Sequence, residues 1–417
     1  MAAYPQSETC RLEQCLEGVG DNRGKTPPLA NSGVDLIEIN ALEDGHKFVL
    51  FERVKKFVTP QTYATWFRAG HPRLGDTLIS TVGAIGRVAY INYERGCIAQ
   101  NIIALRPKSE KTHPEFLYYL LASADTQHRL GSLNIGVAQP SLKVPHLLSL
   151  SVVLPPLPVQ RSIAAILSAY DDLIENNTRR IQILERMAQA LYREWFVNFR
   201  FPGHAQVKLV ASPLGKIPQG WSVQRLDEVA NVNASTIRRG HEPENIFYVD
   251  IASVTTGRIE KIEPMTFADA PGRARRIVQH GDTIWSCVRP NRKSFSLILN
   301  PSASLIVSTG FAVLTPTKVP FSFLHQAVTT DNFVSYLTNN ATGAAYPAIT
   351  AKDFEAAKML LPDESLLRRF NEHCEPMLLL KENLMRKKSN LRRTRDLLLP
   401  KLISGALDAS GLDIEKS

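Results

Sequence analysis

An internal repeat constrains the fold of this chain more than any other feature of the sequence. GDTLIS begins at Gly75 and GDTIWS at Gly281, 206 residues later, and GVAQPSL at Gly136 recurs as GAAYPAI at Gly343, 207 residues later. In both halves the same kinds of segment follow in the same order: short apolar runs typical of strands, a helix-forming run, a loop with Gly and Pro, and a last strand. The sequence therefore predicts two copies of one β-rich domain.

A long helix is predicted to close each half. Positions spaced by seven form one column in the first helix, and adding 207 to each gives a second column that is entirely apolar. Two segments that keep one heptad register predict a coiled-coil seam, although an amphipathic helix packed on its own domain is the alternative. The seam residues are Ile163, Tyr170, Asn177, Leu184 and Leu191 in the first helix and Phe370, Met377, Leu384, Leu391 and Leu398 in the second.

Two residues in these helices carry predictions of their own. Asn177 is the one polar member of the columns, and such a residue fixes register at some cost in stability. Pro376 lies inside the second segment and should break or kink it, leaving a short helix before it and a long one after. From Met377, about 27 residues would span roughly 40 Å at 1.5 Å per residue.

These patterns predict an α+β protein made of four segments. Residues 1–157 and 203–363 form the two β-rich domains, and residues 158–202 and 364–417 contain the long helices. If the helices pair as an antiparallel coiled coil, a pseudo-twofold axis relates the two halves. A chain of 417 residues, 44% of them hydrophobic, is long enough for such domains to have cores of their own.

Composition narrows the class of protein. A net charge of +9 suits a polyanionic partner, for which nucleic acid is the usual candidate, although a merely basic soluble protein fits as well. The five cysteines contain no CxxC pair, which favours a reduced cytosolic protein over a zinc or disulfide framework. Because we find no secretory signal and no run of about 18 apolar residues, we expect a cytoplasmic protein without a membrane span.

Four segments carry a resemblance to a known family. They are GDNRGKTPP (residues 20–28), LPPLPVQRSIAAILSAYDDLIENN (154–177), SPLGKIPQGWSVQRLDEV (212–229) and LRRTRDLLLPKLISG (391–405). In this order and spacing they resemble the specificity (S) subunit of type I restriction-modification enzymes. The first and third look like the starts of two target-recognition domains, and the other two look like the conserved helical regions of that family.

The resemblance implies a function and a set of partners. Such a subunit reads a split site in double-stranded DNA, one half-site per target-recognition domain, and its helices set the length of the unread spacer. It docks two methyltransferase (M) subunits, which carry S-adenosylmethionine and methylate adenine N6, while restriction (R) motor-nuclease subunits cut unmodified DNA. The chain itself would hold no cofactor and would have no membrane partner.

The sequence contains no motif for catalysis. GVGDNRG (18–24) does not connect a strand to a helix as a dinucleotide-binding loop does, and no GxxxxGK[ST] phosphate loop is present. LPPL at Leu154 has the prolines of an adenine methyltransferase turn but no amide, carboxylate or aromatic residue. We therefore predict a non-catalytic protein without a metal site. The alternatives are a stand-alone DNA-binding regulator or scaffold and, less favoured, a self-contained DNA methyltransferase or nuclease.

Residues that read DNA are expected on loops, as Arg, Lys, Asn or Gln side chains that reach base edges. Two loop positions recur in both halves, one after the GDT strand and one at the Gly/Pro segment. The loops of the two halves match in position and differ in side-chain chemistry, as is expected if each half recognises a different DNA half-site. The alternative is that they are ordinary solvated turns. The candidates are Arg87, Arg289, Asn291, Arg292 and Lys293 in the first position and Asn134, Gln139, Ser141, Lys143, Tyr346 and Lys352 in the second.

For three other clusters of basic residues, the sequence predicts a role only in general terms. RRGH (238–241) and GRARR (272–276) are expected to meet phosphates if they meet DNA. The second long helix carries seven basic residues between Lys381 and Arg395. Three roles are open for these basic residues: a solvated helix face, contacts with phosphates of the DNA spacer, or contacts with an acidic partner protein. The sequence does not distinguish between these roles.

Overall fold

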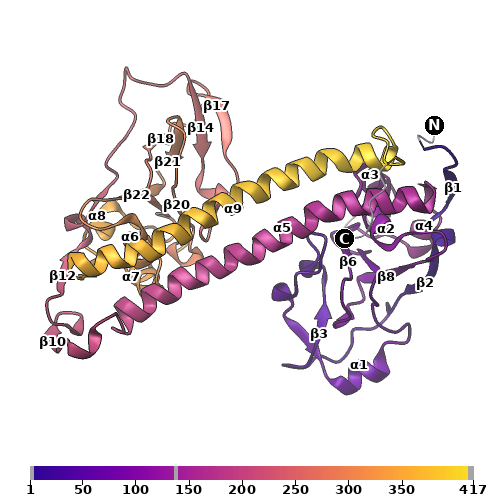
Figure 1. Cartoon of the computed structure of the whole chain (residues 1–417), viewed down its shortest axis with the longest axis horizontal. Coiled ribbons are helices and arrows are strands. Elements are labelled where there is room, and N and C mark those ends of the chain that lie inside the picture. Colours follow the sequence, from indigo (N-terminus) through magenta and orange to yellow (C-terminus); the bar gives the residue numbers. More distant parts are fainter. Residues whose placement is uncertain (1–3, 136–139, 412–417) are drawn as a thin grey trace. The chain divides into compact units, whose positions relative to one another are not determined.

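The computed structural model of the chain describes residues 4–135 and 140–411 (Figure 1). The chain divides into two compact units: unit 1 is Met1–Thr178 with Arg386–Ser417, and unit 2 is Arg179–Met385. Each unit therefore combines one β-rich region with a part of each of the two long helices.

The described residues of unit 1 form three small sheets. The four-stranded antiparallel sheet has the order β2 (Leu16–Gly20), β8 (Ile102–Pro107), β5 (Thr77–Ser80), β6 (Val88–Tyr90). The three-stranded sheet has the order β4 (Lys56–Val58), β3 (Val34–Ile37), β7 (Cys97–Ile98), with β3 and β7 parallel. The third sheet pairs β1 (Glu8–Arg11) with β9 (Ser151–Leu154). The short helices are α1 (Pro60–Trp66), α2 (Pro114–Ala122), α3 (Ala124–Ser132) and α4 (Val144–Leu148).

Unit 2 repeats this plan and adds strands to it. The four-stranded antiparallel sheet is β13 (Ala230–Val232), β22 (Phe311–Pro316), β19 (Thr283–Ser286), β20 (Phe295–Leu297). A second sheet is β17 (Glu263–Thr266), β14 (Asn245–Val249), β21 (Leu305–Ser308), β18 (Ala274–Ile277). The two-stranded sheets are β12 (Ser222–Arg225) with β23 (Lys358–Leu361), β10 (Leu209–Ser212) with β11 (Gly215–Pro218), and β15 (Val254–Thr255) with β16 (Arg258–Ile259). The short helices are α6 (Phe321–Ala327), α7 (Asp331–Asn340) and α8 (Ala351–Glu355).

The internal repeat is therefore present in the strand order as well as in the sequence. β2, β8, β5 and β6 correspond in order to β13, β22, β19 and β20, and β3 runs parallel to β7 as β14 runs parallel to β21. The α+β prediction is confirmed, with a β-rich region followed in the chain by a long helix in each half. The GDT segments lead into β5 and β19, which are the inner strands of equivalent sheets.

Each helix-forming run before the Gly/Pro loop is a pair of short helices. In unit 1 the break lies at Ser123, whose hydroxyl accepts a hydrogen bond from the backbone N–H of Thr126 (3.4 Å). In unit 2 the hydroxyl of Thr330 accepts from the N–H of Phe333 (3.2 Å). These N-caps satisfy a backbone donor at the start of the second helix. In unit 2 a new helix therefore begins inside the run for which the sequence predicts one helix, and in unit 1 it begins where the predicted helix ends.

The two long helices are α5 (Leu157–Tyr192), which a short π-helical turn (Arg193–Val197) extends, and α9 (Glu364–Ser404). The prediction that Pro376 divides the second helix is wrong, because α9 is helical through this residue. Pro376 is exposed, so water can satisfy the carbonyl that it leaves without a donor. Cys374 and Leu378 on either side are buried, and their packing offsets a local cost of about 3 kcal/mol.

Within each unit the two helices lie side by side in opposite directions (Figure 1). In unit 2, Glu185 of α5 pairs with Lys381 of α9, and the ring of Phe196, just beyond α5, makes an edge-to-face contact with the ring of Phe370 near the start of α9 (ring centroids 5.0 Å apart). In unit 1, Asp171 of α5 pairs with Arg395 of α9. Among the described residues, no helix is both long and apolar enough to cross a membrane.

The helices contribute to the hydrophobic core of each unit. In unit 1, Ile163 and Leu167 of α5 and Leu402 of α9 are buried in one cluster with Phe116 of α2. In unit 2, the indole of Trp195 and the rings of Phe323 and Phe370 are buried together in a cluster that also includes β-strand residues. The helices are therefore part of both folded units rather than separate appendages.

Candidate nucleic-acid interface

The two candidate loops of unit 2 meet. Val288, just after β19, forms an isolated antiparallel bridge with Ala348 of the Gly/Pro loop. The backbone N–H of Ile349 donates to the carbonyl of Cys287 (2.9 Å), and the N–H of Arg289 donates to the carbonyl of Pro347 (2.7 Å). Val288 and Ala348 are 60 residues apart in sequence, so two distant loops form one surface here.

The equivalent loops of unit 1 meet in the same way. Val82 forms an antiparallel bridge with Ser141, and the N–H of Leu142 donates to the carbonyl of Thr81 (2.8 Å). The N–H of Gly83 donates to the carbonyl of Pro140 (2.9 Å). Both units therefore join the loop after the GDT strand to the Gly/Pro loop by a backbone bridge at equivalent positions.

Arg289 and Tyr346 are brought into direct contact by this bridge in unit 2. The guanidinium of Arg289 lies over the ring of Tyr346, with its central carbon 4.5 Å from the ring centroid. Its Nη2 also donates to the carbonyl of Ala345 (3.2 Å). Arg289 is half-buried, whereas the side chain of Tyr346 is 68% exposed. Together they form a cation–π pair on an accessible surface.

The remaining candidates of unit 2 lie on or near the same loops. Asn291 and Arg292 are exposed in a short 3-10 turn, Pro290–Arg292. Lys293, which follows, pairs its ammonium with the carboxylate of Asp331 (2.7 Å). Lys352 is exposed in α8, after the Gly/Pro loop.

In unit 1 the candidate side chains are less available. Arg87 is half-buried, and its Nη1 donates to the carbonyl of Leu42 (3.2 Å). Asn134 accepts a hydrogen bond from the N–H of Ser141 (2.9 Å) through its Oδ1. Lys143 is exposed at the N-terminus of α4, and Gln139 lies outside the described residues.

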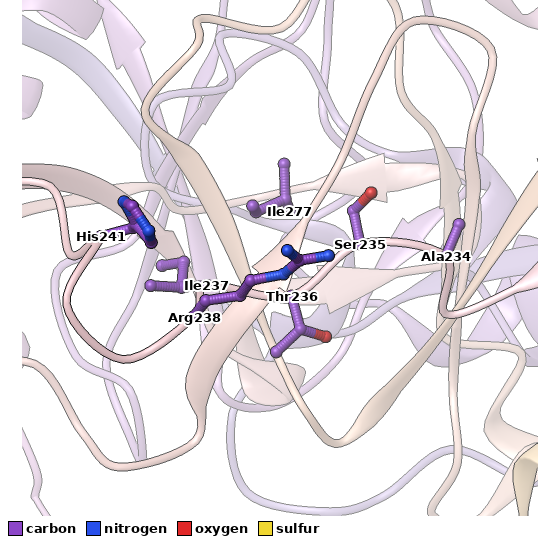
Figure 2. Close-up of a pocket in the computed structure, with 7 residues that line it drawn as sticks. All are labelled: Ala234, Ser235, Thr236, Ile237, Arg238, His241 and Ile277. Carbon is purple, nitrogen blue, oxygen red and sulfur yellow. The ribbon is translucent and has the colours of Figure 1, made fainter.

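A second basic feature of unit 2 is an open groove of about 590 Å³ beside β18 (Figure 2). It is lined by Ala234, Ser235, Thr236, Ile237, Arg238, His241 and Ile277. The backbone of this wall pairs with β18, because the N–H of Ile237 donates to the carbonyl of Arg275 (2.9 Å) and the N–H of Ile277 donates to the carbonyl of Ser235 (3.1 Å). RRGH and the end of GRARR therefore lie close together, which sequence reasoning did not predict.

Two arginines of β18, the strand next to this groove, are half-buried. Arg276 donates from Nη1 to the hydroxyl of Thr236 (3.4 Å), and burial lowers the pKa of its guanidinium. Arg275 lies over the ring of Phe267, 4.7 Å from its centroid. A guanidinium in such surroundings gains from an added anion, because little water competes for it.

Comparisons with known proteins agree with these features. The family described as "Type I restriction modification DNA specificity domain" matches residues 69–186. The type I restriction enzyme MjaIX specificity subunit of Methanocaldococcus jannaschii is 24% identical over 315 residues, 70% of this chain and 69% of that protein. The HindI specificity subunit of Haemophilus influenzae is 31% identical over 130 residues, 30% of this chain and 28% of that one.

A solved structure shares the fold. The S subunit of a type I restriction-modification system from M. genitalium aligns with a TM-score of 0.58 at 15% identity, covering 95% of this chain and 96% of that chain. Over about two thirds of its length the chain is similar to specificity subunits of type I restriction-modification enzymes.

The predicted seam residues of the long helices are buried to different degrees. Ile163, Asn177, Phe370 and Leu384 are buried, and Tyr170, Leu184, Leu191, Met377, Leu391 and Leu398 are half-buried. A neighbouring heptad column of α5 is buried more deeply. It contains Leu167, Ile174, Ile181 and Ala188 and continues to Trp195.

Charged side chains are also buried where α5 and α9 pair in unit 1, which the sequence pattern did not reveal. Arg395 of α9 is 5% exposed and pairs with Asp171 of α5, which is 4% exposed and accepts a second hydrogen bond from the hydroxyl of Tyr119 (2.6 Å). Burial alone would lower the pKa of Arg395, but Asp171 raises it, so the guanidinium stays charged. Arg395 is therefore a structural residue rather than part of a solvated basic face.

The described residues contain no group of three or more His, Cys, Asp or Glu side chains placed to hold a metal ion. The chemistry that the arrangement offers is recognition: planar and basic side chains on paired loops, and a basic groove.

Proposed function

We propose that this chain is a specificity subunit that reads a bipartite target in double-stranded DNA, one half-site per β-rich region, within a type I restriction-modification complex. The observation that carries the proposal is the repeated loop pair. Val82 and Ser141 in unit 1 and Val288 and Ala348 in unit 2 make the same backbone bridge, yet the side chains around them differ. Two surfaces that are built on the same backbone bridge and carry different side chains suit two different half-sites.

The division of labour follows the four segments of the sequence. Residues 1–157 and 203–363 are the target-recognition domains, and residues 158–202 and 364–417 are the helical regions that set the spacer. In unit 2, Arg238 in the groove and Arg276 of the neighbouring strand β18 supply phosphate contacts, which position the domain without reading bases. The net charge of +9 favours such contacts.

The chemistry of the complex belongs to its partners. Two methyltransferase subunits carry S-adenosylmethionine, and restriction subunits cut DNA that lacks methylation; this chain supplies no catalytic group and acts in the cytoplasm. Apolar side chains on the outer sides of the long helices offer contact area for the methyltransferase subunits. They are Leu173, Ile183 and Met187 on α5 and Leu380 and Leu397 on α9.

Methylome sequencing tests the proposal directly. The chain is expressed with the methyltransferase subunits in a host that lacks adenine methylation at the sites concerned, and the methyltransferase subunits alone serve as the control. We expect N6-methyladenine in a split motif only when the chain is present. Methyl transfer by the purified chain alone would contradict the proposal, as would a motif that does not depend on the chain.

A domain exchange tests the assignment of half-sites. Residues 1–157 are replaced by the same region of a relative that recognises another target. We expect one half of the methylated motif to change while the other half and the spacer stay the same. A change in both halves would show that the two recognition domains do not act independently.

A further inference from the structure

Arg289 adopts a left-handed backbone conformation, and the equivalent residue of unit 1 is a glycine. An offset of 206 aligns Gly83 with Arg289, and both residues are left-handed, with φ of 83° and 52°. Glycine adopts this region freely, but a residue with a Cβ is destabilised there by about 1–2 kcal/mol. Unit 2 therefore carries local strain that a glycine would remove.

The rest of the turn preserves this strained geometry. Lys293 on the other side of Pro290–Arg292 is also left-handed, with φ of 55°. The N–H of Arg292 donates to the carbonyl of Arg289 (2.9 Å), and that of Lys293 donates to the carbonyl of Pro290 (3.0 Å). The bridge to the Gly/Pro loop fixes the backbone of Arg289 from outside the turn. Non-glycine residues held in this way concentrate at functional sites.

The side chain of Arg289 is fixed as well as its backbone. The ring of Tyr346 supports one face of the guanidinium, and the carbonyl of Ala345 takes one of its five N–H donors. A guanidinium oriented before binding loses less side-chain entropy when it meets a ligand. Because Tyr346 is 68% exposed, this oriented pair lies at the surface rather than in the core.

We propose that Arg289 reads a guanine in the second half-site and that Tyr346 is its positioning residue. This inference rests on the function proposed above. A guanine presents O6 and N7 side by side in the major groove, and a planar guanidinium can donate to both at once. A phosphate can be met from many directions, so a mobile basic side chain can contact it without backbone strain. The strained backbone of Arg289 and its contact with Tyr346 hold the guanidinium in one orientation, and a bidentate contact with a base depends on that orientation.

The test uses the complete complex with the methyltransferase subunits and a set of DNA duplexes in which each base pair of the second half-site is varied. Arg289→Lys keeps the charge and removes the planar fork. We expect discrimination at one G·C pair to fall by about 5- to 150-fold, the range for one bidentate contact, and the other positions to keep their preference. Arg289→Gly should have the same effect while it relieves the strain.

Tyr346 is tested by a pair of variants. Tyr346→Ala removes the support and should lower discrimination at the same base pair, by about fivefold. Tyr346→Phe keeps the ring and should restore most of it, because the ring face carries the cation–π contact. Asn300→Gly is the control for backbone strain, since Asn300 is also left-handed (φ 47°) but lies in another loop of unit 2, and it should leave discrimination unchanged.

Three outcomes would overturn the inference. If Arg289→Lys and Arg289→Gly leave every preference unchanged, the turn is an ordinary solvated turn. If Arg289→Gly weakens all sequences equally and makes the salt dependence less steep, Arg289 contacts phosphate instead. If the unaltered complex recognises no split site, the proposed function itself fails, which the wild-type measurement reveals before any variant is made.

Discussion

In each unit a basic residue of α9 connects a glycine of the β-rich region to an acidic residue of α5, but the basic and acidic residues differ between the units. In unit 1, Nη1 of Arg395 donates to the carbonyl of Gly45 (3.1 Å) while the guanidinium pairs with Asp171. In unit 2, Nζ of Lys381 donates to the carbonyl of Gly257 (3.4 Å) and pairs with Glu185 (2.8 Å). Both glycines are left-handed, and both basic residues belong to α9 while both acids belong to α5.

Burial separates the two contacts. The side chains of Arg395 and Asp171 are 6% and 3% exposed, whereas those of Lys381 and Glu185 are 12% and 26% exposed. A deeply buried pair has already lost its hydration, so removal of one partner leaves a charge that nothing compensates. A partly exposed pair can exchange its partner for water. Loss of this ion pair should therefore lower the stability of unit 1 strongly and that of unit 2 only slightly.

The largest expected effect comes from breaking the buried pair. Arg395→Leu should lower the free energy of unfolding of unit 1 by about 3–5 kcal/mol, because the Asp171 carboxylate is left buried and unpaired. Lys381→Leu should cost about 1 kcal/mol in unit 2. Hydrogen exchange with mass spectrometry, followed through denaturant, measures the two units separately.

A double variant separates charge from packing in this comparison. Asp171→Asn removes the charge and keeps an oxygen that can accept from Tyr119. When Asp171→Asn is combined with Arg395→Leu, more than half of the lost stability should return. Equal losses for Arg395→Leu and Lys381→Leu would show that burial does not distinguish the two contacts.

Acid should also act on the loop that holds Gly45. Burial lowers the pKa of His46 to about 4, and nearby cations add to the effect; they are Arg392, Lys388, Arg53 and Arg395. In the folded unit, Nε2 of His46 lies 2.7 Å from Nη2 of Arg392, where a neutral imidazole can accept a hydrogen bond. Glu43, 3.6 Å away, is the acidic group that faces His46.

Because the pKa of His46 is lower in the folded state, the unfolded chain takes up the proton first as the pH falls. Unit 1 should lose up to about 3 kcal/mol between pH 6.5 and 4, and this group should contribute no further loss below pH 4. His46→Gln should remove this part of the pH dependence from unit 1 only. Unit 2 should keep its own dependence, since burial lowers the pKa of His325 to about 3. A pH titration of exchange rates in both units is the measurement.

Replacing the aspartate of the GDT motif by asparagine should destabilise unit 1 more than unit 2. Asp76 accepts two hydrogen bonds from Arg106 (3.0 and 2.9 Å), whereas Asp282 accepts from the hydroxyl of Thr315 (2.6 Å) and the N–H of Gln279 (2.8 Å). Asp76→Asn should cost about 1.5–3 kcal/mol, because it weakens charge-assisted bonds. Asp282→Asn should cost less than about 1 kcal/mol, because burial already raises the pKa of Asp282 and so favours its neutral form. Chemical denaturation of both variants decides this, and a larger loss for Asp282→Asn would reverse the comparison.

The smallest expected effect concerns the recognition turn of unit 1. Gly83→Ala should cost about 1 kcal/mol, because φ of 83° is unfavourable for a residue with a Cβ. The added Cβ itself would meet only Ile39 at 3.7 Å, an ordinary contact. Gly131→Ala in α3 is the control and should be neutral or stabilising, since it is helical and has no atom within 4 Å of the new Cβ. Thermal melts compare the two, and no difference would remove the strain argument for this turn.

Local patterns made much of the architecture predictable. The recurrence of GDTLIS as GDTIWS indicated two equivalent domains, and the observed strand orders agree. Spacing by seven indicated the long helices, because a helical face repeats with nearly that period. Each of these signals lies within a short window of sequence. They fixed the kinds of element and their order along the chain.

Other features depend on partners that are distant in sequence. The continuity of α9 through Pro376 follows from the packing of Cys374 and Leu378 against a core that no local pattern describes. The stacking of Arg289 on Tyr346 requires the bridge between their loops. For both, the sequence supplied candidate residues without the contacts that define their roles.

The sequence by itself determined that this protein is a duplicated α+β chain with two long helices, because periodicity and repetition are properties of the chain alone. Only the tertiary structure decided which charges are buried and which loops meet. Arg395 belongs to a run of basic residues that would suit a solvated face, and it became an interior residue because Asp171 and Gly45 lie opposite it. Burial and electrostatic partnership are set by what surrounds a side chain in space, and this environment forms only when the chain has folded.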